Sequence, residues 1–196
     1  MLIIDAHRRA VLGSVAVVSR ITADELRRDT PCAGWHLGDL LAHMTIQHDG
    51  FAAAATGHGA DPAVWRPRPL GADPTGEYAA AAHRVLDAFA APDVLTREFA
   101  LPEISTAVTF PAERAIGFHL VDYVVHGWDV ARSLGLPYQL DAEVLEIALR
   151  VAAAVPDGEN RLAPGAAFAP GLPVPGNAPA LDRVVALLGR SPAWPA

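Results

Sequence analysis

Two histidines and two aspartates recur at helical spacing within the segment 111–134. They are His119, Asp122, His126 and Asp129, and the stripe ends at Ser133. Spacings of three and four residues place side chains on one face of a helix. Asp122 and His126 are four apart, with about 5–6 Å between Cβ atoms. A carboxylate oxygen and an imidazole nitrogen can then reach one ion at about 2.0–2.2 Å. The pair is therefore a candidate part of a divalent-metal site.

The same stripe could instead be the solvated face of its helix, which is the commoner reason for such a pattern. Solvated faces usually carry Glu, Lys, Arg and Gln, whereas this one carries His and Asp beside Tyr123 and Trp128. Buried Asp is rare unless it is paired or bound to a metal. We therefore expect a buried stripe. Asp129 would accept a hydrogen bond from a ligand histidine, bind a backbone donor or be a surface acid. His119 would support the ligands, carry protons or be a boundary residue.

A third ligand is needed, and the segment HLGDLLAHMTIQH offers His43 in mid-helix. A lone histidine on such a face is usually a core or boundary residue. His48 lies five residues on and points elsewhere, and His36 lies close to the helix start. The remaining histidines have no partner at ligand spacing: His7, His58 and His83. The residues alone leave the third ligand open.

The elements that would position these side chains are mostly helical. Apolar periodicity and stop signals such as Gly57 and Gly135 predict helices over 4–20, 36–56, 75–91, 111–134, 142–155 and 180–189. Asp73 before Pro74 and Asp141 before 142 are expected to cap their helices. The segment 94–110 is irregular or a short hairpin, and 57–74 and 156–179 are rich in Pro and Gly. We predict an all-α, or nearly all-α, four-helix bundle with accessory helices, forming one domain over 1–196.

Composition narrows the function. The net charge is −7, all fifteen basic residues are Arg, and they form no run, so nucleic acid and anionic membranes are not expected partners. No apolar stretch is long enough to span a membrane, and the first residues lack the order of a signal peptide, so we expect a cytoplasmic protein. Cys32 is the single cysteine, which excludes an internal disulfide. We interpret it as a small packed residue.

Several motifs resemble a known family. They are TPCAGWHLGDLLAHM (30–44), LVDYVVHGWDVARSLG (120–135), FAPGLPVPGNAPALDRVVALLGRSPAW (168–194) and the Ala-rich helices between them. The chain resembles the DinB-like superfamily of metal-binding helical bundles, within the actinobacterial group related to mycothiol-dependent maleylpyruvate isomerase. The resemblance implies one divalent ion held by His43, Asp122 and His126. The isomerase branch more typically has Glu at the position of Asp122.

The resemblance also implies a chemistry. Three protein ligands leave coordination positions open, as in catalytic sites. Zinc is the first candidate, and nickel, iron or manganese could use the same ligands. The implied partners are mycothiol or a similar thiol and a small electrophile, for S-transfer or isomerisation, with a homodimer by family habit. The alternatives are a non-catalytic metal-binding bundle in stress response and a metal-dependent hydrolase. Candidates to bind a substrate carboxylate are Arg84, Arg114 and Arg132.

Overall fold

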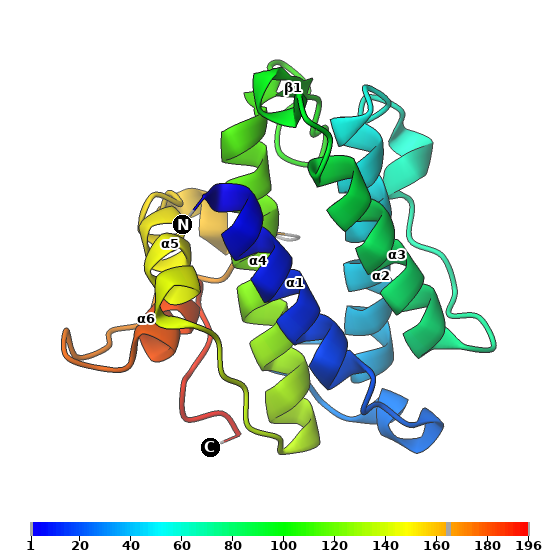
Figure 1. The fold of residues 1–196 in the computed structure, drawn as a ribbon. Helices are drawn as coiled ribbons and strands as arrows, with labels where there is room; N and C mark the ends of the chain where they lie inside the picture. The colour runs from blue at the N-terminus through cyan, green and yellow to red at the C-terminus, as the bar shows by residue number, and fades with distance from the viewer. Residues whose placement is uncertain (1, 164–165, 196) are drawn as a thin grey trace.

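The computed structural model describes residues 2–163 and 166–195, and it is nearly all-α (Figure 1). Its helices are α1 (Ile3–Val18), α2 (Leu37–Ala55), α3 (Pro74–Phe89), α4 (Ala112–Leu134), α5 (Ala142–Ala153) and α6 (Ala180–Leu187). Four short 3-10 helices connect them: η1 (Ala23–Arg27), η2 (Pro62–Trp65), η3 (Val94–Thr96) and η4 (Glu159–Leu162). The predicted fold class is confirmed, and the 3-10 turns are the elements that periodicity did not predict.

The first four helices form the bundle, in which α1 packs along α4 and α2 along α3 (Figure 1). α5 and α6 pack against each other beside α4. α4 is buried from two sides. Leu120 and Val124 belong to a cluster shared with α1, α5 and α6, whereas Tyr123 and Val130 belong to one shared with α1, α2 and α3. A polar stripe on this helix therefore faces other helices rather than water.

The segment 94–110 is a short hairpin, as one of the two expectations had it. β1 (Glu98–Phe99) and β2 (Phe110–Pro111) pair antiparallel, with Glu98 opposite Pro111. β2 leads directly into α4. The hairpin therefore fixes where α4 begins, and α4 is the helix that carries Asp122 and His126.

Helix ends follow the residues that predicted them, with one exception. Gly135 ends α4 in the left-handed region at φ 68°. The Asp73 carboxylate accepts from the Gly76 N–H at the start of α3. Asp141 precedes α5 but makes no side-chain cap; its carboxylate accepts from Arg9 of α1 at 2.9 Å instead. Asp141 thus holds the N-cap position, as predicted, but its carboxylate forms a charge-assisted hydrogen bond with a guanidinium of another helix and makes no cap hydrogen bond.

The Pro/Gly-rich segment 156–179, of which residues 164 and 165 lie outside the described part, is attached to the helices on either side. Arg161 is only 5% exposed. Its guanidinium donates to the carbonyls of Pro156 and Leu187, at 2.8 and 2.7 Å. These bonds hold the end of α6, and hence the residues that follow it, against the bundle. Among the helices described, none is long and apolar enough to cross a membrane.

Candidate metal centre

His43 of α2 and the pair Asp122 and His126 of α4 come together in the folded chain. Each offers one ligand atom, and the three atoms lie within 4.8 Å of one another. His126 Nε2 is 3.3 Å from Asp122 Oδ1, and the rings of His43 and His126 have centroids 5.3 Å apart. The residues alone had left the third ligand open between several histidines. The crossing of α2 and α4 places His43 beside the pair.

The charges within this trio are coupled. Burial by itself would lower the pKa of His126, but the charge of the Asp122 carboxylate and the hydrogen bonds that His126 donates to Asp122 and Asp129 raise it well above its usual value. Burial would raise the pKa of Asp122, and the neighbouring His126 outweighs this and lowers it. Burial and the charge of His126 lower the pKa of His43 to about 4. At neutral pH the trio therefore holds a charged His126–Asp122 pair and a neutral His43.

Asp129 holds the other nitrogen of His126. Its Oδ2 lies 3.0 Å from His126 Nδ1, and its side chain is fully buried. A carboxylate on Nδ1 fixes the tautomer and directs Nε2 toward Asp122 and His43. Among the roles left open for Asp129, that of a surface acid was wrong, because Asp129 is fully buried. The solvated-face interpretation of the whole stripe was also wrong, because His119, His126 and Ser133 are buried as well.

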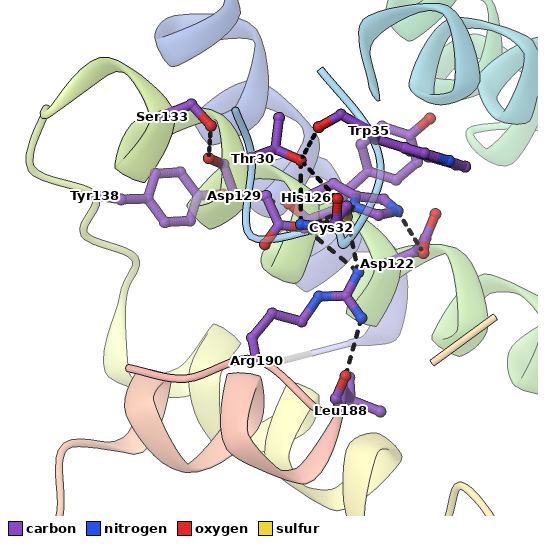
Figure 2. Close-up of polar contacts among 11 residues, drawn as sticks. Thr30, Cys32, Trp35, Asp122, His126, Asp129, Ser133, Tyr138, Leu188 and Arg190 are labelled. Carbon is purple, nitrogen blue, oxygen red and sulfur yellow. Dashed lines mark hydrogen bonds and ion pairs between the residues drawn. The ribbon is translucent and has the colours of Figure 1, made fainter. Parts of the chain in front are cut away.

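Two residues in this network were not anticipated, Cys32 and Arg190 (Figure 2). The Cys32 thiol donates to Asp129 Oδ2 at 3.2 Å, and Arg190 Nη2 lies 3.1 Å from the sulfur. Arg190 reaches in from the segment after α6 and is 6% exposed. Cys32 packs against the core cluster of α1, α2, α3 and α4, as predicted, but its thiol is also part of this polar network. Its place was not predictable by spacing, because its partners come from α4 and from the C-terminal segment.

Cys32, His126 and Asp129 form a second group whose potential ligand atoms lie within 4.8 Å of one another. A cation already lies there, since Arg190 Nη2 is 3.5 Å from Asp129 Oδ2 as well as close to the sulfur. A metal ion at that point would be repelled by the buried guanidinium. The trio of His43, Asp122 and His126 is the better candidate for an ion.

His119 belongs to a different group, although it is on the same stripe. Its Nδ1 lies 2.7 Å from His7 Nε2, and its Nε2 lies 3.3 Å from His48 Nδ1. All three imidazoles are fully buried. The stripe therefore divides into a metal-candidate half and a histidine cluster shared by α1, α2 and α4. His7 and His48 had no ligand spacing within their own helices, so only tertiary packing shows this cluster.

The three arginines considered for a substrate carboxylate are engaged elsewhere. Arg84 forms an ion pair with Asp49 at 2.7 Å, and Arg114 lies over phenylalanine rings. Arg132 donates to a backbone carbonyl at 2.8 Å. The guanidinium that does lie close to the trio is that of Arg190. After burial and His126, its charge is a further influence on the pKa of His43 and of Asp122, and it lowers both.

The coupled charges predict that metal binding releases a proton. A ligand histidine must be neutral. His126 is an imidazolium cation at pH 7 because its pKa is raised, whereas His43 is already neutral. We expect about one proton released per ion bound at pH 7. Isothermal titration calorimetry with Zn²⁺ in buffers of different ionisation enthalpy measures this number. A value near zero would contradict the charged His126–Asp122 pair.

The sequence of this chain is similar to one described protein family and to two mycobacterial proteins. The family model described as mycothiol maleylpyruvate isomerase N-terminal domain matches residues 7–131, which include the trio. Two uncharacterized proteins from different strains of Mycobacterium tuberculosis are each 33% identical over 187 residues, covering 95% of this chain and 96% of theirs.

Two crystal structures share the fold, those of the mycothiol-dependent maleylpyruvate isomerase and of a histidine-to-alanine mutant of it. Their TM-scores are 0.51 and 0.56, at 16% and 15% identity, covering 78% of this chain and 67% of each of theirs. At such identity the structural likeness concerns the fold alone. The match to the family model covers more than half of the sequence, and the chain therefore belongs to the mycothiol maleylpyruvate isomerase N-terminal domain family.

Proposed function

We propose that this chain is an enzyme that uses one divalent ion, held by His43, Asp122 and His126, to activate a low-molecular-weight thiol of the mycothiol type. The observation that carries the proposal is the donor set itself. Two imidazoles and a carboxylate converge within 4.8 Å from two helices, and a buried carboxylate orients one of the imidazoles from behind. Such sets suit zinc first, and nickel, iron or manganese next.

The ion would supply Lewis acidity, which favours the deprotonated form of a thiol at neutral pH. The protein's own residues prepare the site for it. Once His126 gives up its extra proton, the Asp129 carboxylate at Nδ1 favours the tautomer whose Nε2 is free to bind an ion, and Arg190 lies 3.5 Å from that buried carboxylate. His43 is neutral at neutral pH and so is ready to act as a ligand. These features keep the ligand atoms oriented before an ion arrives.

The nucleophile is proposed to come from outside the chain. Cys32 is the single cysteine in the sequence. Its sulfur lies 3.9 Å from His126 Nδ1, the nitrogen that faces away from Asp122, and it is bonded to Asp129 and Arg190. The thiol of Cys32 is therefore behind the ligand histidine, on the side away from the trio. A small external thiol is needed for sulfur chemistry at the trio itself.

The reaction class proposed is transfer of the thiol to a small electrophile, or isomerisation through thiol addition and elimination. Support for the thiol comes from the family, whose name and solved structures refer to mycothiol. The substitution of Asp122 for the Glu that the isomerase branch typically carries shortens this ligand by one methylene and keeps its charge. Because the family is described by its maleylpyruvate isomerase, maleylpyruvate is one substrate to test beside general electrophiles.

Kinetics with zinc-loaded protein would test the proposal. The protein should accelerate the conjugation of mycothiol to a chromogenic aryl halide, or the mycothiol-dependent isomerisation of maleylpyruvate. The rate should saturate as the mycothiol concentration rises. The His126→Ala variant should lose this activity, and the exposed-residue control His83→Ala should keep it. A protein that binds one ion but accelerates no thiol reaction would be a non-catalytic metal-binding bundle. Cleavage of ester or amide substrates without any thiol would indicate the hydrolase instead.

A further inference from the structure

Trp35 is an exposed aromatic residue at the edge of the candidate metal centre. Its ring centroid is 4.9 Å from that of His43, with the planes at 59°. Trp35 is 37% exposed, whereas Trp65 and Trp128 are 5% and 4% exposed. An aromatic side chain that is half in water beside a site presents an apolar ring face on which a ligand can pack.

The loop that carries Trp35 is fixed from both sides. The Thr30 hydroxyl donates to the Trp35 carbonyl at 3.0 Å and accepts from the Cys32 N–H at 3.1 Å (Figure 2). The Trp35 N–H donates to the Cys32 carbonyl at 3.0 Å. The Cys32 thiol is itself bonded to Asp129, which orients His126. The backbone of Trp35 is thus held by the same network that orients a ligand, which places the indole against the ring of His43 and lowers the ordering cost of the loop when something binds.

We propose that Trp35 determines the specificity of the site for a thiol that bears a carbohydrate head group, by stacking on the face of a sugar ring. The proposal rests on the proposed function, since the sulfur of that thiol would be bound at the trio next to His43. The C–H face of a sugar ring is apolar and matches an indole face, while its hydroxyl edge stays in water. A partly exposed ring suits such a half-solvated ligand.

The loop that carries Trp35 favours a neutral partner over an anionic one, and the imidazole that follows it, His36, lies 3.3 Å from the Asp29 carboxylate. The loop 30–35 reads TPCAGW and carries no charged side chain. Arg190, the guanidinium nearest in the network, is buried and bonded to Cys32 and to the Leu188 carbonyl. A small electrophilic carboxylate placed against Trp35 would therefore gain no charge pairing there. The uncharged sugar of the thiol is the better occupant.

The test compares two thiols on the metal-loaded protein: mycothiol, which has the carbohydrate, and N-acetylcysteine, which lacks it. Trp35→Ala should raise KM for mycothiol about tenfold, from lost stacking, with kcat and bound zinc unchanged. KM for N-acetylcysteine should stay as in the wild type, and Trp35→Phe should recover most of the affinity for mycothiol. An equal loss for both thiols, a loss only for the electrophile, or no loss for mycothiol would overturn the assignment.

A binding measurement separates this inference from the proposed function. S-methyl mycothiol has no free thiol and cannot react, so it reports on the head group alone. It should quench tryptophan fluorescence in the wild type and leave Trp35→Phe unchanged. If the wild type shows this quenching but no thiol-dependent turnover, the proposed function fails and the Trp35 assignment stands. If turnover with mycothiol occurs and neither quenching nor a KM effect is seen, the assignment fails alone.

Discussion

Replacing His43 with alanine should remove the ion from the purified protein. Loss of a residue that merely orients a metal ligand typically costs about 10–100-fold in affinity, so loss of one of three ligands should cost more than about 100-fold. His126→Ala and Asp122→Ala should have the same effect. Asp122→Glu keeps the carboxylate and restores the residue typical of the isomerase branch, so it should retain binding.

His43→Ala is the cleanest of these variants. Burial keeps His43 neutral, and removing a neutral imidazole leaves no buried charge unpaired. Removing His126 leaves Asp122 and Asp129 without their shared partner, and such a loss can destabilise a fold by about 3–5 kcal/mol. Circular dichroism should therefore accompany the metal analysis of His126→Ala.

Elemental analysis of protein purified without added metal, followed by competition with a chelator, measures the effect. The wild type should carry close to one equivalent. His83→Ala is a matched control, since His83 is exposed on α3 and donates only to a backbone carbonyl of its own helix. A full equivalent that persists in the His43→Ala/His126→Ala double variant would contradict the proposed centre.

The parts of this molecule that were predictable from the sequence are those set by local periodicity. The spacing of Asp122 and His126 is a property of one helix, and the burial of their stripe followed from its His and Asp content. The helix boundaries at Gly135 and Asp73 follow from residues with strong conformational preferences. Local rules were enough there because no other part of the chain was involved.

The unpredicted parts depend on how helices cross. His43 was a candidate from its mid-helix position and was tied to the pair mainly through a family resemblance. The crossing of α2 and α4 is what brings the three ligand atoms together. Cys32 and Arg190 meet because a connector and the segment after α6 both end at Asp129. A helical period says which face a residue occupies but not which element covers that face. A homodimer, one domain over the whole chain and a cytoplasmic location stay predictions.

The histidine cluster leads to the second large effect, which is loss of stability in acid. Burial lowers the pKa of His7 to about 3, and burial with neighbouring imidazoles lowers the pKa of His48 and His119 well below 6.5. In the unfolded chain all three titrate near about 6.5. Below that pH the unfolded state binds more protons than the folded state, so stability falls as pH falls.

The size of the effect follows from the number of groups. Each depressed histidine contributes a slope of about 1.4 kcal/mol per pH unit, so three contribute about 4 kcal/mol per unit once the pH is well below 6.5. A domain of ordinary stability has about 5–15 kcal/mol to lose. His43 adds to this slope down to about pH 4, where it titrates in the folded state. His126 does not, because its raised pKa leaves it protonated in both states below about 6.5. We expect acid unfolding within about one to three pH units below 6.5.

Urea unfolding of the chelator-treated protein between pH 7 and 4.5 would measure the slope. His7→Gln is the informative variant, because an amide can both donate and accept and so can replace the hydrogen bond between His7 Nε2 and His119 Nδ1 without titrating. Its slope should fall by about a third of the part due to the three histidines, whereas His83→Gln, at an exposed site, should leave it unchanged. Equal slopes in the wild type and His7→Gln would show that the cluster does not set acid stability. His119 stacks on Tyr123, the residue after the candidate ligand Asp122. Charging the histidine cluster should therefore also loosen the metal centre. In zinc-loaded protein, bound zinc should be released over the same pH range in which the fold opens.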